Sequence, residues 1–326
     1  MSMSMTTPSA PATEPATWRP KARLFGELQD LKRQRPAHLD APLSTVLFRR
    51  AWRRLLAGAD FGSVADATTA EALTNVLFPG CDEAFFPVVG LSAADTRALL
   101  REALATTAGD AVGPATMTRL RDATDALAER YSSASEPDAA PLPRSLDLLC
   151  RQPRAGATRP GIARLVLVPA EMHADHCLLT AVYAALAAED FGADAGVAFV
   201  CGLAHHLHNA LLPDCGFAGE ILLGSHLAQV ISVGRERALA ELPVGLRQRV
   251  REALRHHETL SAPEGEAISA GDVLDRVLDV KWRTRAAAVT DADILDDLDL
   301  VHAGPLKEFQ LGLLSAAGVW SRPPSR

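Results

Sequence analysis

The hydrophobic and polar positions follow a helical period along most of the chain. Apolar side chains recur three or four positions apart, as they do along one face of an α-helix. In the first part of the chain this spacing covers residues 20–35, 41–58, 91–109 and 113–131. Ser92 stands where an N-cap is expected, and Gly58 follows a basic last turn. The pattern therefore predicts a helical N-terminal region over residues 17–132.

A break in this pattern divides the chain. Residues 133–161 are rich in Pro, Ser and Ala and predict an irregular linker. The helical period then returns within residues 162–302, over the segments 170–192, 194–209, 217–233, 242–258 and 269–286. We assign residues 1–16 to a disordered tail and residues 303–326 to a C-terminal helix and tail. Alternation with a period of two is almost absent, so the sequence predicts an all-α fold.

Composition and charge narrow the classes of partner. The 326 residues are 48% hydrophobic and only 5% aromatic, which provides for a core and favours helices over strands. A formal net charge of −7 counts against nucleic acid as a partner, because phosphate binding needs a concentrated basic face. We interpret the basic stretch FRRAWRR at 48–54 as a solvated helix face or a protein contact. The N-terminal helices are accordingly the candidate surface for a protein partner or for self-association.

Cysteine usage and hydropathy indicate the compartment. The five cysteines are odd in number and form no C-x-x-C pair, which is typical of reduced thiols in a cytoplasmic protein. The apolar run at 195–204 has half the length needed to cross a bilayer. The first residues lack a basic segment followed by an apolar one, so they do not resemble a secretory signal. We expect a cytoplasmic protein with no membrane partner.

Histidines are concentrated in one part of the chain. Eight of the ten lie between positions 173 and 257, and they are His173, His176, His205, His206, His208, His226, His256 and His257. The next predicted helix opens with Asp272 and, nearly one turn later, Asp275. Imidazole and carboxylate together bind divalent first-row metals, and helical bundles build such sites from one or two ligands per helix. We predict a centre for one or two divalent ions of Fe, Mn, Zn, Co or Ni.

The order of these residues resembles the HD-domain superfamily of metal-dependent enzymes. In the stretch DHCLLTAVYAALAAEDFGADAGVAFVCGLAHHL, His176 matches the first histidine of the family, and His205, 29 residues later, matches the histidine of its HD pair. RHHE resembles the motif of the third helix, and AGDVLDRVL is similar to the closing ADxLD, with Asp272 at the ligand position. The resemblance covers about residues 165–285 and implies an HD-like bundle. The predicted metal ligands are His176, His205, His206, His226, His256, His257 and Asp272.

The sequence departs from the family at one position. His206 stands where the family has the Asp of the HD pair, which ligates metal and bridges two ions in dinuclear members. A neutral imidazole offers one lone pair and no negative charge, so it does not bridge in the same manner. The substitution is compatible with a single ion, with a softer ion, or with lost chemistry. Asp214 and Asp175 are candidates for the missing carboxylate, and Asp275 competes with Asp272 for the ligand position.

The resemblance implies a metal-dependent phosphohydrolase that acts on a phosphate ester or anhydride of a small molecule. Arg276 and Lys281 follow Asp272 on the same predicted helix and are candidates to neutralise the substrate phosphate. Two alternatives remain open. The domain is a non-catalytic sensor or scaffold if the loss of the Asp removed the chemistry. It is a diiron oxygenase of the HD type if the same helices hold two irons.

Overall fold

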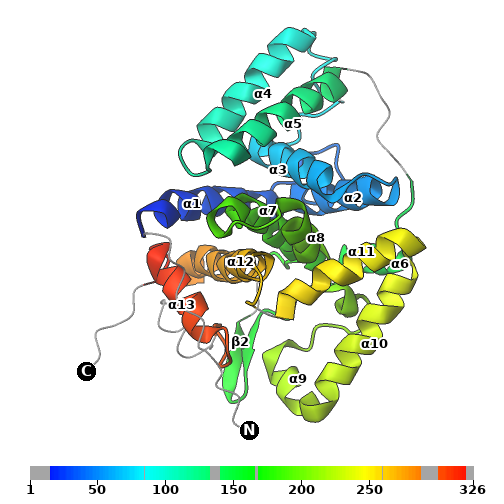
Figure 1. Ribbon diagram of the computed structural model, residues 1–326, viewed down its shortest axis with the longest axis vertical. Coiled ribbons are helices and arrows are strands. Elements are labelled where there is room, and N and C mark those ends of the chain that lie inside the picture. Colours follow the sequence, from blue (N-terminus) through cyan, green and yellow to red (C-terminus); the bar gives the residue numbers. More distant parts are fainter. Residues whose placement is uncertain are drawn as a thin grey trace.

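The structure is a computed structural model that describes residues 15–83, 85–132, 140–165, 168–258, 260–287 and 300–320. Residues 1–14 of the predicted N-terminal tail, residues 133–139 of the predicted linker and residues 321–326 of the predicted C-terminal tail lie outside the described residues. Within the described residues nearly all regular structure is helical, which confirms the all-α prediction (Figure 1). Pro15 and Ala16, which we had assigned to the tail, begin the first helix.

The N-terminal region is helical where the sequence predicts it. Its elements are α1 (Pro15–Leu28), the 3-10 helix η1 (Gln29–Lys32), α2 (Leu43–Leu56), α3 (Phe61–Leu77), α4 (Ala93–Ala108) and α5 (Pro114–Ser132). The Ser92 side chain caps α4 by accepting a hydrogen bond from the backbone N–H of Asp95, as expected. Asp60 caps α3 in the same way, through Ser63. Gly58 follows α2 with φ +92°, a conformation that favours glycine.

The second part of the chain contains the remaining elements. They are α6 (Arg144–Leu149), β1 (Ala157–Arg159), β2 (Ile162–Leu165), α7 (His173–Phe191), α8 (Ala195–Ala204), η2 (Leu207–Ala210), α9 (Gly216–Leu223), η3 (Gly224–His226), α10 (Leu227–Ala240), α11 (Val244–Leu254), η4 (Arg255–Glu258), α12 (Pro263–Ala287) and α13 (Lys307–Ala316).

The described part of the predicted linker is not irregular throughout. It contains α6 and strand β1, which pairs antiparallel with β2, Arg159 opposite Ile162. Pro160 and Gly161 form the turn between the strands, and Gly161 has φ +80°. The Pro-Gly signal that we interpreted as part of a linker therefore marks a hairpin.

Both parts of the chain contribute to one core. A single hydrophobic cluster includes Trp18 and Phe48 from the N-terminal region together with Leu178 and Val273 from the second part. Helix α7 is buried along almost its whole length and packs against α12, α8, α2 and α3 (Figure 1). A helix that is apolar on all sides is stable only inside such a core. The predicted linker thus joins two segments of one packed structure.

Two glycines allow α8 and α12 to approach α7 closely. A Cβ atom on Gly202 of α8 would lie 2.7 Å from the Cα of Ala181, and one on Gly271 of α12 would lie 2.7 Å from the carbonyl oxygen of Thr180. Both distances are shorter than van der Waals contact, so only glycine fits without displacing the α7 backbone. Gly202 comes three residues before His205, and Gly271 directly precedes Asp272. The close contacts therefore bring candidate ligands together.

A different apolar stretch is exposed. Within the described residues, the helical stretch Gly216–Ala240 alone has the length and apolar composition of a membrane span, and none of its most apolar window is buried. It comprises α9, η3 and α10, and its Leu222 is 88% exposed. The run at 195–204 that stands out in the sequence is instead the buried α8. One stretch selected by length and composition is weak evidence for a membrane segment.

Candidate metal centre

Three of the predicted ligands converge at the contact of α7, α8 and α12. His176 projects from α7, His205 follows the end of α8, and Asp272 lies on α12. The Nε2 atom of His176 is 3.1 Å from Nε2 of His205 and 3.2 Å from Oδ1 of Asp272. The third separation, from Nε2 of His205 to Oδ1 of Asp272, is 3.9 Å. Both imidazoles are buried, and Asp272 is partly exposed.

Hydrogen bonds at the other ring nitrogens determine the tautomer of each imidazole. Nδ1 of His176 donates to Oδ2 of Asp275 at 2.6 Å, and Nδ1 of His205 donates to the carbonyl oxygen of Gly202 at 2.6 Å. A carboxylate and a carbonyl only accept, so each Nδ1 carries the proton. In the neutral form of each ring the lone pair is therefore on Nε2, and the two Nε2 atoms lie beside each other and Asp272. Metal-binding histidines are held by this kind of contact on the outer nitrogen.

This arrangement fits a divalent cation. Two lone pairs 3.1 Å apart, with a carboxylate oxygen beside them, repel one another unless a positive charge lies between them. Ligand atoms about 2.1 Å from one ion lie roughly 3.0–3.5 Å apart at octahedral or tetrahedral angles. Two of the three separations fall in this range, and the third is slightly wider. The residues present can thus hold a metal ion.

Electrostatics keep the centre in its metal-binding protonation state. Burial lowers the pKa of His205 well below its ordinary value, and the neighbouring His176 and His257 lower it further. Burial alone would raise the pKa of Asp272, but Arg276 and His176 hold it well below its usual range. At neutral pH His205 is therefore a neutral imidazole and Asp272 an ionised carboxylate, the forms that bind metal.

His206 and His257 are adjacent to the three converging ligands. The ring centroids of His205 and His206 are 4.2 Å apart, and those of His205 and His257 are 5.3 Å apart. Nδ1 of His206 donates to Oδ1 of Asn209 at 2.8 Å, so its lone pair is on Nε2. His176, His205 and His206 each place a ring nitrogen within 4.8 Å of the others. His206 therefore lies close enough to His176 and His205 to share an ion with them.

Two predicted ligands do not reach the centre. His226 ends η3 with an exposed side chain and does not line the pocket beside the ligands. His256 points toward α12 instead, where its Nδ1 lies 3.8 Å from Oε2 of Glu264. Consecutive side chains of the 3-10 turn η4 point in different directions, so only His257 of the pair faces the pocket. The structure therefore brings neither His226 nor His256 to the three converging ligands.

The aspartates divide into different roles. Asp175 is buried and accepts hydrogen bonds from the hydroxyls of Ser44 and Thr45 and from the backbone N–H of Met172, at the start of α7. It is a structural cap and does not replace the missing carboxylate. Asp214 lines the pocket, and its Oδ2 lies 3.8 Å from Nε2 of the buried His173.

A buried charge network that the sequence pattern did not predict lies behind His176. Lys32 of η1 lies between Glu171 and Asp275, with its Nζ 2.5 Å from Oε1 of Glu171 and 2.8 Å from Oδ1 of Asp275. Glu171, His176 and Asp275 are close enough together to form a metal-binding group by distance alone. The ammonium of Lys32 already supplies the positive charge there, so we interpret this group as an ion-pair network. Nothing in the local sequence pattern of Lys32 distinguishes it from a surface lysine.

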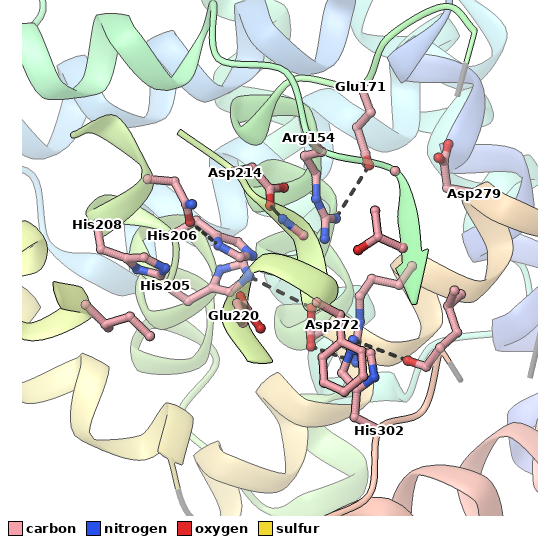
Figure 2. A pocket seen from close by; sticks show the side chains of 18 of the residues that line it. Arg154, Glu171, His205, His206, His208, Asp214, Glu220, Asp272, Asp279 and His302 are labelled. Carbon is pink, nitrogen blue, oxygen red and sulfur yellow. Dashed lines mark hydrogen bonds and ion pairs between the residues drawn. The ribbon is translucent and has the colours of Figure 1, made fainter. Parts of the chain in front are cut away.

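A cavity of about 410 Å³ opens onto the candidate ligands (Figure 2). Arg154, Arg235 and Arg276 line it together with His205, His206 and Asp272. Nη2 of Arg276 is 3.2 Å from Oδ2 of Asp272, which places its guanidinium beside the centre.

The lining of the cavity is partly apolar. The rings of Phe217 and His302 stack at 4.0 Å, and Ile231 and Leu300 also belong to the lining. Lys281 does not line the cavity, because its Nζ donates to the carbonyl oxygen of Val319 at 2.5 Å. The structure therefore does not bring Lys281 to the cavity, whereas Arg276 is part of its lining.

Comparison of the chain with protein-family models, curated proteins and solved structures finds no match.

Proposed function

We propose that the chain is a metal-dependent phosphohydrolase of the HD type that acts on a phosphate ester or anhydride of a small molecule. The observation that carries this proposal is the lone-pair cluster of His176, His205 and Asp272, open to a cavity beside Arg276. The order of these residues along the chain resembles that of the HD superfamily, and their geometry is compatible with a single divalent ion. Such an ion would supply polarisation of a phosphoryl oxygen and activation of a water molecule.

The residues around the centre have separate tasks in this proposal. Asp275 and the carbonyl of Gly202 keep the two imidazoles in the orientation that presents Nε2 to the ion. Arg276 orients Asp272 and offers its guanidinium to a phosphate oxygen, since planar guanidinium groups bind phosphate with two parallel hydrogen bonds. Arg154 lies across the cavity, where its pKa is raised by Glu171 and Asp214 despite burial, so it stays charged.

His206 favours one ion over two. Its Nδ1 is bound to Asn209, which leaves one lone pair and therefore one coordination bond. Diiron oxygen chemistry needs an acid that bridges two ions, and His206 stands where the family resemblance places that acid. Hydrolysis with a single ion is compatible with the neutral ring. The five free thiols agree with a cytoplasmic setting for this activity.

Metal quantification tests the proposal. Protein purified without added ions should contain about one divalent ion per chain, and His205→Ala should lose it. His226→Ala is the matched control, because that imidazole is exposed and outside the cavity. The wild-type protein should also hydrolyse p-nitrophenyl phosphate or bis(p-nitrophenyl) phosphate, and a chelator should abolish the reaction.

Three results would contradict the proposal in different ways. Protein without metal, and with equal stability in both variants, would favour the scaffold alternative. Bound iron with oxygen-dependent turnover would favour the oxygenase. Equal metal content in His205→Ala and wild type would show that the ion binds elsewhere.

A further inference from the structure

Lys32 connects the N-terminal helices to the candidate metal centre. Its side chain is 1% exposed and enters the space behind α7 and α12 from η1. Nζ donates to Oδ2 of Asp275 at 2.9 Å and lies 3.9 Å from Oδ1 of Asp279. Glu171 completes the set of carboxylates around it. One buried ammonium thus holds three buried carboxylates together.

Asp275 is the point where this network meets the centre. Its Oδ2 accepts from Nδ1 of His176 at 2.6 Å and also from Lys32. Its Oδ1 accepts from Nε2 of Gln29 at 2.7 Å. Gln29 and Lys32, the two donors other than His176, belong to the N-terminal region and lie more than 240 residues from Asp275 in the sequence. With both oxygens engaged, the carboxylate has a single orientation.

We propose that Lys32 is a positioning residue of the metal centre, which acts through Asp275 to hold the His176 ring with Nε2 toward the ion. The inference rests on the proposed metal centre and adds a task for the N-terminal helices, that of completing the support of its first ligand. Without Lys32, Glu171 and Asp279 would repel Asp275 in a buried setting, so the carboxylate would turn away from its present orientation. His176 would then lose the acceptor that fixes its ring.

The test is Co²⁺ binding to the full-length chain and to Lys32→Met, which keeps the length of the side chain and removes its charge. Supporting contacts of this kind change metal affinity by about ten- to a hundredfold. We therefore expect the Co²⁺ dissociation constant of Lys32→Met to rise by about that factor. The visible absorption bands of bound Co²⁺ should also change in shape, because the His176 ring is no longer held in one orientation.

Lys21→Met is the matched control. Lys21 is also a buried lysine of the N-terminal region, and it pairs with Asp190 of α7, away from the centre. Its loss should lower stability without changing Co²⁺ affinity or the Co²⁺ spectrum. A merely structural role for Lys32 would give the same result in both variants.

The outcomes separate this inference from the proposed function. Wild-type protein that binds no Co²⁺ would overturn the metal centre and the inference together. Wild-type affinity and spectrum in a folded Lys32→Met would overturn the inference and leave the metal centre intact. Should Lys32→Met not fold, Gln29→Met removes a neutral donor from the same carboxylate, and it should weaken Co²⁺ binding several-fold. Unchanged Co²⁺ binding in that variant would also overturn the inference.

Discussion

Nδ1 of His176 lies 2.6 Å from Oδ2 of Asp275, on the side of the ring opposite to the candidate metal centre. Asp272, three residues earlier in α12, instead faces Nε2 of the same ring at 3.2 Å. The two aspartates therefore bind opposite edges of one imidazole. Asp272 is placed to ligate the ion, and Asp275 is placed to orient the ligand.

Substitution of these two aspartates should separate their roles. Asp272→Ala removes a ligand atom and should abolish stoichiometric metal binding. Asp275→Asn keeps an oxygen that accepts from Nδ1, so it should retain metal with an affinity lower by about ten- to a hundredfold. Metal titration of both purified variants checks this order. A stronger loss in Asp275→Asn than in Asp272→Ala would reverse the assignment.

Arg276 should act on substrate more than on metal. Loss of a hydrogen bond to a charged group costs about 1.5–3 kcal/mol, so Arg276→Gln should lower kcat/KM for a phosphate ester by roughly ten- to a hundredfold. Lys281→Gln is the control, since Lys281 contacts the carbonyl of Val319 outside the cavity. Steady-state kinetics on p-nitrophenyl phosphate measures both. Equal losses in the two variants would argue against phosphate binding by Arg276.

Glu71 should be important for stability although it lies away from the centre. Its buried carboxylate accepts from Arg54 at 2.8 Å and Arg130 at 3.0 Å, and it also contacts Arg50. Arg50 and Arg54 of the basic stretch at 48–54 are therefore paired with a buried carboxylate of the same chain. Breaking a buried ion pair costs about 3–5 kcal/mol, and Glu71→Gln should lower the free energy of unfolding by that amount.

The control for Glu71 is Glu129→Gln, because Glu129 is exposed and pairs only at the surface with Arg97. Its free energy of unfolding should change by about 1 kcal/mol or less. Urea unfolding of the two variants gives the comparison. Similar values in both would mean that Glu71 is not held as the structure describes.

The carboxylate of Glu71 should also affect how the stability of the protein falls at acidic pH. Burial alone would raise the pKa of Glu71, but Arg130, Arg50 and Arg54 hold it well below its ordinary value of 4.5. As the pH falls, the carboxylate of Glu71 takes up a proton in the unfolded chain before it does so in the folded protein. The contribution of Glu71 to stability is therefore present above about pH 4.5 and is lost as the pH falls toward the pKa in the folded state. In Glu71→Gln, stability should fall less steeply below pH 4.5. If the free energy of unfolding fell equally steeply below pH 4.5 in the variant and the wild type, the lowered pKa of Glu71 would be contradicted.

Gly271 should be essential to the helix contact beside Asp272. Gly271→Ala places a Cβ 2.7 Å from the carbonyl oxygen of Thr180, and such overpacking costs about 1–3 kcal/mol. Gly245→Ala is the control, because a Cβ there meets nothing within 4 Å. Thermal unfolding should show a lower Tm for Gly271→Ala and an unchanged or higher Tm for Gly245→Ala. A Tm for Gly271→Ala equal to that of the wild type would contradict the close approach of α12 to α7.

The sequence by itself determined the helical elements and the segment in which the candidate ligands lie. Periodicity and capping are local properties, which is why the helices and the Ser92 cap are where the pattern predicts them. Tertiary packing decided which of two neighbouring side chains faces the cavity, and it selected His257 over His256. Lys32 and Asp275 are 243 positions apart, and only the folded chain places them in contact, because no local pattern records which buried charges will meet.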